Sequence, residues 1–177
     1  MSFRLRSKVS PAALHTIREA FEDLERIVTP ADAKEFGDST LQNVQKAALE
    51  IENRLGARRS LRNMRRIMPL FTGLQHYSKS IEVLCNGTPF LPWIWAPVKL
   101  ILTIASDFVD AFQEIIKQYA HIGQVLTRFE LLQGAFSTHQ EFQIVLAIFY
   151  SDILRYHKEA YQFVRRRSES ICNPCHT

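Results

Sequence analysis

The stretch that decides the fold class is residues 98–129, VKLILTIASDFVDAFQEIIKQYAHIGQVLTRF. Its apolar residues recur every three or four positions, which is the period of one face of an α-helix and not that of a β-strand. These positions are Val98, Ile101, Leu102, Ala105, Phe108, Val109, Phe112, Ile115, Ile116, Tyr119, Ile122, Leu126 and Phe129. The pattern predicts one long central helix, or two helices in line that bend near Gly123.

The same period continues on both sides of this stretch. Ser10 and Pro11 have the residue types of an N-cap and a first helical position, so a helix is expected to begin there. Thr29-Pro30 would open a short helix with Asp32 in its first turn, and a last helix is expected over residues 138–166. We therefore predict an all-α, single-domain multi-helix bundle.

Length and composition fit one ordinary globular core. The chain has 177 residues, of which 46% are hydrophobic and 23% charged, so it needs no metal or disulfide to fold. The formal net charge is +4, and the basic character is local, because the segment from Arg54 to Ser80 contains no acid. We predict a basic arm at residues 1–9, the helical bundle at 10–167, and a polar, disordered tail at 168–177.

The sequence predicts no membrane span and no secretory signal. The most apolar stretch, Pro89–Ala105, is interrupted by two prolines and Lys99, whereas a spanning helix needs about 20 nearly uninterrupted apolar residues. Three cysteines without a secretory signal favour a reducing compartment. We therefore expect a cytoplasmic location.

Residues 90–102, FLPWIWAPVKLIL, resemble a signature of the helical N-terminal domains of fungal NACHT and ankyrin proteins of the STAND, or NOD-like receptor, class. That signature consists of tryptophan, a small residue, proline, an aliphatic residue and lysine. Downstream, Ile122-Gly123 and Leu126–Glu130 resemble the isoleucine-glycine step and the closing arginine-aromatic-glutamate turn of the family. The similarity covers about residues 60–166. The signature positions here are Trp93, Trp95, Pro97, Lys99 and Gly123.

The resemblance implies a non-enzymatic module that precedes a nucleotide-binding oligomerisation domain in a receptor. The chain contains no G-x-x-x-x-G-K-[ST] phosphate loop and no ankyrin repeat, so the ATPase activity of such receptors does not carry over. We expect a protein-interaction or signalling domain that binds a protein partner or self-associates. The alternative is a membrane-active bundle that binds anionic lipid.

Four arginines are a candidate surface for an anionic partner. They are spaced at i, i+4, i+7 and i+8 and would share one helical face. One hypothesis is a solvated face that neutralises acidic helices of the same domain. The other is contact with lipid headgroups, nucleic acid or an acidic protein. Nucleic acid is the least favoured of these, because no aromatic residues interleave with the arginines. The four residues are Arg58, Arg62, Arg65 and Arg66.

Residues 88–97 contain three prolines and both tryptophans, and we expect a rigid connector there. The tryptophans favour core anchoring over membrane wedging, because the acids that follow have the wrong sign for an anionic bilayer. Lys99 would be a helix-start residue with its ammonium in solvent.

No catalytic, cofactor or metal constellation is predicted, and we expect no enzyme. Cys172, Cys175 and His176 match C-x-x-C-H, the attachment motif of c-type haem, but a polar tail offers no haem pocket. Whether these three residues bind anything stays open. The other histidines show no ligand spacing, and each is expected at the surface or half-buried with its polar atoms satisfied; they are His15, His76, His121, His139 and His157.

Overall fold

The computed structural model describes residues 10–34, 39–57, 68–85, 91–136 and 138–172. All regular elements in this part of the chain are α-helices, which confirms the all-α multi-helix bundle. They are α1 (Pro11–Glu25), α2 (Pro30–Lys34), α3 (Leu41–Ala57), α4 (Met68–Cys85), α5 (Leu91–Ala105), α6 (Val109–Phe136) and α7 (Gln140–Cys172).

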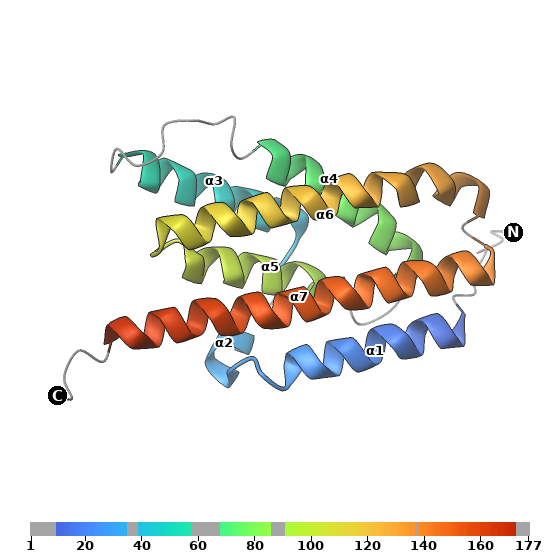
Figure 1. The fold of residues 1–177 in the computed structure, drawn as a ribbon, viewed down its shortest axis with the longest axis horizontal. Coiled ribbons are helices and arrows are strands. Elements are labelled where there is room, and N and C mark those ends of the chain that lie inside the picture. The colour runs from blue at the N-terminus through green and yellow to red at the C-terminus, as the bar shows by residue number, and fades with distance from the viewer. Residues whose placement is uncertain (1–9, 35–38, 58–67, 86–90, 137, 173–177) are drawn as a thin grey trace, which may run out of the picture.

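The helices pack in pairs around α5 (Figure 1). α4 packs mainly on α6 and α1 mainly on α7, while α5 contacts α3, α7 and α6. α5 is buried on most sides, because buried residues follow one another along it, from Ile94 to Val98 and from Leu100 to Leu102, while Lys99 and Thr103 reach solvent. A helix that is apolar over most of its circumference belongs inside a domain. The core of the bundle is therefore centred on α5.

The first helix begins where the sequence predicts, at Pro11 after Ser10. The Ser10 side chain makes no capping hydrogen bond. Its backbone N–H instead donates to Oε1 of Gln143 on α7, at 2.8 Å, and both residues are buried. The start of α1 is thus fixed by α7, a helix more than 130 positions away in the sequence.

The predicted rigid connector is helical over most of its length. α5 begins at Leu91, so residues 91–97 belong to the helix, with Pro92 in its first turn and Pro97 in its interior. Proline is tolerated in the first turn, but an interior proline removes one hydrogen bond at a cost of about 3 kcal/mol. Complete burial of Ile94 and Val98 around Pro97 offsets that cost. Lys99 accordingly lies within the helix and not at its start.

The prediction of one long central helix, or two in line bending near Gly123, is wrong. The chain breaks at Ser106–Phe108, and α6 then runs back in the direction opposite to α5 (Figure 1). The Phe108 N–H donates to the Ala105 carbonyl at 2.8 Å and the Ser106 hydroxyl to the Thr103 carbonyl at 2.6 Å, which replaces helical pairing by a turn. Periodicity missed this turn because Phe108 continues the apolar pattern through it.

The last helix is longer than predicted. α7 extends to Cys172, so a polar tail beginning at residue 168 is wrong for residues 168–172, which are helical. The basic arm at residues 1–9 and the remaining tail residues, including Cys175 and His176, lie outside the described residues.

Candidate functional site

The arginine face lies outside the part of the chain that the structure describes. Arg58, Arg62, Arg65 and Arg66 all fall in the undescribed segment 58–67. Their grouping on one helical face therefore stays a prediction.

The signature residues near the start of α5 lie in the core or at its edge. Trp95 is buried, and its ring meets the ring of Tyr77 on α4 edge-on at a centroid distance of 5.4 Å. Pro97 is buried, whereas Lys99 is partly exposed. The backbone of Trp93 belongs to α5. Trp95 thus anchors α5 to α4, and wedging into a bilayer would require removing it from this packing.

Gly123, the last signature residue, is the point where α6 crosses α4. A Cβ atom on Gly123 would lie 2.0 Å from the Cα of Gly73, and one on Gly73 would lie 2.6 Å from the Tyr119 carbonyl oxygen. Both glycines have ordinary helical backbones, so they are required for close approach and not for conformation. Gly73 has no signal in the sequence, because its role depends on Gly123, which lies 50 positions later in the chain and meets it only in space.

A second link joins the same two helices. Glu130 of α6 accepts from Lys79 Nζ at 2.5 Å and lies 2.5 Å from His76 Nδ1, both on α4. The hydrogen bonds from Lys79 and then His76 lower the pKa of the Glu130 carboxyl. The predicted closing turn Arg128–Glu130 is instead helical, because these residues lie inside α6.

His157 is fully buried, contrary to the expectation of a surface or satisfied histidine. Neither ring nitrogen has a hydrogen-bond partner, and the ring is enclosed by Tyr77, Tyr119 and Tyr156 from α4, α6 and α7 at centroid distances of 6.4, 5.7 and 6.1 Å. Burial lowers the pKa of the imidazole to about 3. The sequence does contain a signal for this burial: His157 lies four residues after Ile153 and four before Tyr161, so it shares a helical face with an apolar and an aromatic residue.

A buried carboxylate fastens the short helix α2 to α7. Asp32 accepts from the Tyr161 hydroxyl at 2.6 Å and from Arg165 Nε at 3.0 Å, while the Thr29 N–H donates to the Tyr161 oxygen at 3.2 Å. Burial alone would raise the pKa of Asp32, but the hydrogen bonds from Arg165 and Tyr161 outweigh it and the pKa is lowered. The Asp32 carboxylate thus finds its hydrogen-bond partners within the protein, which is typical of a structural contact. We call Asp32, Tyr161 and Arg165 together the clasp.

Exposed and partly buried apolar side chains line the seam between α6 and α7. On α6 its apolar residues repeat every three or four positions. A row of apolar residues on α7 faces them: the ring of Phe129 stacks on that of Phe149 at a centroid distance of 5.1 Å and lies 6.3 Å from that of Phe142. Four seam residues are between two fifths and three fifths exposed. We define the α6–α7 seam as Ile122, Val125, Phe129, Leu132 and Phe136 with Phe142, Val145, Phe149, Tyr156 and Phe163.

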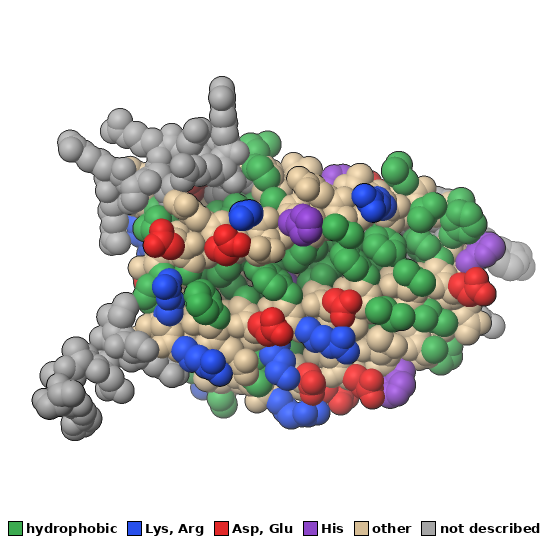
Figure 2. Space-filling model, in the orientation of Figure 1, with side chains coloured by type: hydrophobic (Ala, Val, Ile, Leu, Met, Phe, Trp, Pro, Cys, Tyr) green, Lys and Arg blue, Asp and Glu red, His purple; other side chains and the backbone are tan. Residues whose placement is uncertain are grey.

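Figure 2 shows hydrophobic side chains gathered along this line, with charged side chains on both sides. At the N-terminal end of α6 the seam deepens into two adjoining hollows of about 700 and 380 Å³. Both are lined by Asp110, Glu159, Phe163 and Arg167. We call these two hollows together the furrow.

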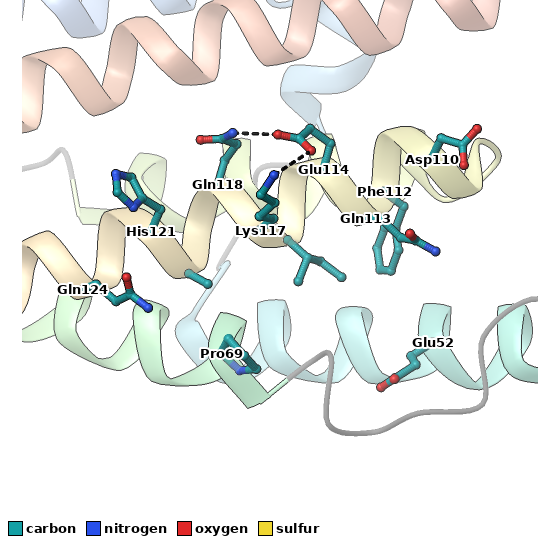
Figure 3. A pocket seen from close by; sticks show the side chains of 12 residues that line it. Glu52, Pro69, Asp110, Phe112, Gln113, Glu114, Lys117, Gln118, His121 and Gln124 are labelled. Carbon is teal, nitrogen blue, oxygen red and sulfur yellow. Dashed lines mark hydrogen bonds and ion pairs between the residues drawn. The ribbon is translucent and has the colours of Figure 1, made fainter.

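A broader groove lies on the other side of α6 (Figure 3). It has a volume of about 880 Å³, and Glu52 of α3 and Pro69 of α4 lie across from the polar side chains of α6. Glu114 accepts from Gln118 Nε2 at 2.7 Å and pairs with Lys117 at 3.8 Å. The described lining contains no serine, threonine or cysteine, so this groove offers no hydroxyl or thiol nucleophile.

The described residues contain no group of three or more histidine, cysteine and acidic side chains placed to hold a metal ion. Within the same residues, no helix combines the length and the apolar character needed to cross a membrane.

The sequence profile of one family, described as "Domain of unknown function (DUF7708)", matches residues 67–174. The chain belongs to the DUF7708 family. No match is found among curated proteins or among solved structures. The DUF7708 match spans α4 to α7 and leaves α1 to α3 outside.

The DUF7708 region contains the glycine crossing, the buried His157 and both sides of the seam. The clasp, in contrast, joins Asp32, outside the matched region, to Arg165 inside it. The exposed seam is therefore a property of the DUF7708 helices themselves, and α1 and α2 cover a different face of α7.

Proposed function

We propose that this DUF7708 chain is a non-enzymatic protein-interaction and signalling domain of the cytoplasm, comparable to the N-terminal adaptor or effector region of fungal NACHT-type STAND receptors. The resemblance of residues 90–102 and of Gly123 supports the receptor assignment, and cysteine usage supports the compartment. The observation that carries the interaction role is the α6–α7 seam, where four exposed apolar side chains lie beside aromatic side chains that are partly buried against the core. The four are those of Leu132, Phe136, Val145 and Phe163.

An exposed apolar stripe of this kind is typical of a protein-binding surface. Single apolar side chains on a surface are normal, but a continuous row of aromatic residues rimmed by charge marks an interaction site. The seam includes Phe129, Phe142, Phe149, Tyr156 and Phe163, and aromatic residues are enriched at interface hot spots. Partner or self-association through this seam would bury that row.

The polar groups favour this role over catalysis. Two carboxylates, Asp32 and Glu130, are held between helices by hydrogen bonds that lower their pKa values. The buried imidazole of His157 has no polar partner that would orient it as a general base. These side chains stabilise the bundle, while the exposed seam is left for binding.

The test compares two matched double variants. Leu132→Ser with Val145→Ser alters the seam, whereas Leu131→Ser with Ile148→Ser removes two other exposed apolar residues from the same two helices, of which Leu131 is more exposed than either seam residue. Leu131 and Ile148 each lie one residue before a seam residue, and one residue corresponds to about 100° of turn around an α-helix, so neither belongs to the seam. Proteins crosslinked to the chain in the cell that encodes it should be recovered with the parent and the control and lost with the seam variant.

Co-sedimentation with vesicles containing phosphatidylserine distinguishes the proposed protein-interaction role from the alternative of a membrane-active bundle. Recovery of the same proteins with both variants, or binding to vesicles without any crosslinked protein, would contradict the proposed function. Unfolding midpoints of both variants within a few degrees of the parent would show that any loss is a loss of contact.

A further inference from the structure

We infer that protonation of His157 opens the bundle between two groups of helices, and that this opening uncovers the aromatic rings that lie between the groups. The first group is α1, α2 and α7, and the second group is α3, α4, α5 and α6. In Figure 1, α1 and α2 lie along one side of α7, and the second group lies along the other. The opening needs no partner, so it stands apart from the proposed function.

Polar contacts hold the first group together. The clasp joins α2 to α7, and the Ser10 N–H before α1 donates to Gln143 of α7. Lys158 Nζ of α7 lies 3.6 Å from Asp23 Oδ2 of α1. Because each of these contacts ends on α7, α1 and α2 would move together with that helix.

Polar contacts and close packing also hold the second group together. Glu130 joins α6 to His76 and Lys79 of α4, and the glycine crossing brings the same two helices together. The Arg54 guanidinium of α3 donates to the Ser106 hydroxyl in the turn that follows α5. These contacts would be kept when α7 moves away.

The contacts between the two groups include pairs of aromatic rings. Tyr77 of α4 lies 6.1 Å from Tyr150 of α7, and Tyr119 of α6 meets Tyr156 of α7 edge-on at 5.8 Å, both measured between ring centres. Trp95 of α5 packs edge-on against Tyr77 and adds a ring that does not titrate. Ring contacts of this kind act through burial and dispersion, so they supply no charge to the boundary.

His157 lies at this boundary and is enclosed by both groups. Tyr77 and Tyr119 of the second group and Tyr156 of its own helix surround its ring, and the residue is fully buried. Neither ring nitrogen has a hydrogen-bond partner, and the buried Tyr119 hydroxyl has none either. A charged ring here would lose its hydration without gaining an acceptor, and tyrosine faces offset only a small part of that loss. Separation of the groups would restore the hydration.

The titratable groups that enclose His157 are tyrosines, which stay neutral in acid. Burial raises the pKa of Tyr119 on α6 well above its usual value, and burial followed by the charge of Glu114 raises the pKa of Tyr156 on α7. Tyr77 faces the ring from α4. Burial is the only cause that lowers the pKa of His157, to about 3, so no carboxylate of a neighbouring helix compensates a charge there.

The pH dependence of the opening follows from the two states of His157. Its pKa is about 3 in the closed bundle and 6.5 in the open chain, so the open form binds a proton more readily and gains population as the pH falls. From pH 7.5, the ratio of open to closed molecules should rise about fourfold by pH 6 and about 30-fold by pH 5. Asp32 and Glu130 have lowered pKa values, so the polar contacts within both groups persist in this range.

Thiol labelling measures the opening. Ile153→Cys places a thiol one turn before His157 on the same buried face of α7, whereas Ala13→Cys places one on the buried face of α1, inside the first group. Each full-length variant is labelled with methyl methanethiosulfonate between pH 7.5 and pH 5, and mass spectrometry separates the new cysteine from the native ones. Each rate is divided by that of the urea-unfolded chain at the same pH, which removes the pH dependence of the thiol. Leu146→Cys, two turns before Ile153, gives the same test if Ile153→Cys does not fold.

We expect the relative rate at Ile153→Cys to rise about 30-fold from pH 7.5 to pH 5 and to exceed that at Ala13→Cys at least about tenfold throughout. Low urea should accelerate labelling at Ala13→Cys more steeply, because global unfolding exposes more surface than a local opening. His157→Leu should hold the Ile153→Cys rate within about twofold across this range. The control His15→Gln removes an exposed histidine and should keep the rise.

Three outcomes would overturn the inference. Equal relative rates and an equal urea response at both cysteines would mean that protonation acts only through global unfolding. A rate at Ile153→Cys that does not change with pH would mean that the boundary does not open on protonation. A rise that survives in His157→Leu would assign the pH dependence to another group. The crosslinking test of the seam is measured separately at neutral pH, so the proposed function can stand when this inference fails.

Discussion

Replacing Gly123 by alanine tests the closest helix crossing in the molecule. The added Cβ would lie 2.0 Å from the Gly73 Cα, and 3.0 and 3.1 Å from the Gly73 carbonyl carbon and nitrogen. Carbon atoms in contact normally lie about 3.5–4.0 Å apart. Because the obstacle is backbone and not a flexible side chain, α4 and α6 would have to separate by about 1.5–2 Å.

Two effects of opposite sign decide the magnitude. Alanine is a better helix former than glycine by about 1 kcal/mol, which alone would stabilise α6. Overpacking costs about 1–3 kcal/mol and occasionally more, and here it also loosens the buried Leu74, Tyr77 and Tyr119 along the crossing. We therefore expect a net destabilisation of about 2 kcal/mol or more, or about 4–8 °C in the unfolding temperature.

Urea unfolding followed by circular dichroism measures this difference. The Gly123→Ala variant should lower the midpoint without changing the slope, and Gly73→Ala should do the same, because its Cβ would lie 2.6 Å from the Tyr119 carbonyl oxygen. Gln124→Ala, at the neighbouring exposed position, is the control and should lie within about 0.5 kcal/mol of the parent. A Gly123→Ala variant as stable as the parent would refute the close crossing.

Three further predictions concern the core and the clasp. Trp95→Ala should destabilise the fold by about 3–5 kcal/mol, measured by the same unfolding curves, and an unchanged midpoint would show that the ring is not a core anchor. His157, with its pKa at about 3 when folded and 6.5 in the open chain, binds a proton more readily when unfolded, so stability should fall as the pH drops below 6.5 and continue to fall towards pH 3. That loss should reach about 2 kcal/mol at pH 5 and be absent in His157→Leu, whereas the exposed-site control His15→Gln should keep the parent's slope. Asp32→Asn should lower the free energy of unfolding by about 1–2 kcal/mol at neutral pH, a value kept small because Arg165 is about a third exposed. Because the folded pKa of Asp32 is lowered, the difference between variant and parent should shrink as the pH falls below about 4. A constant difference down to pH 2 would contradict the clasp.

The sequence by itself determined the secondary structure class and several helix ends. Helical period and capping are local properties, so the apolar repeats predicted an all-α bundle, and Ser10-Pro11 and Thr29-Pro30 marked the starts of α1 and α2 correctly. The sequence also identified Trp95 as a core candidate, because a large aromatic residue among prolines rarely stays exposed.

Only the tertiary structure decided how those helices meet, because contacts between distant residues leave no local pattern. The turn at residues 106–108 is hidden by Phe108, whose apolar side chain continues the period while its N–H closes a turn on Ala105. Gly123 is required only because Gly73 lies against it in the folded chain. Asp32 likewise finds its partner only in Arg165, which lies 133 positions away. The seam likewise depends on the packing of α6 on α4 and of α7 on α1 and α5, because that packing leaves one face of each helix to solvent and turns the two faces towards each other.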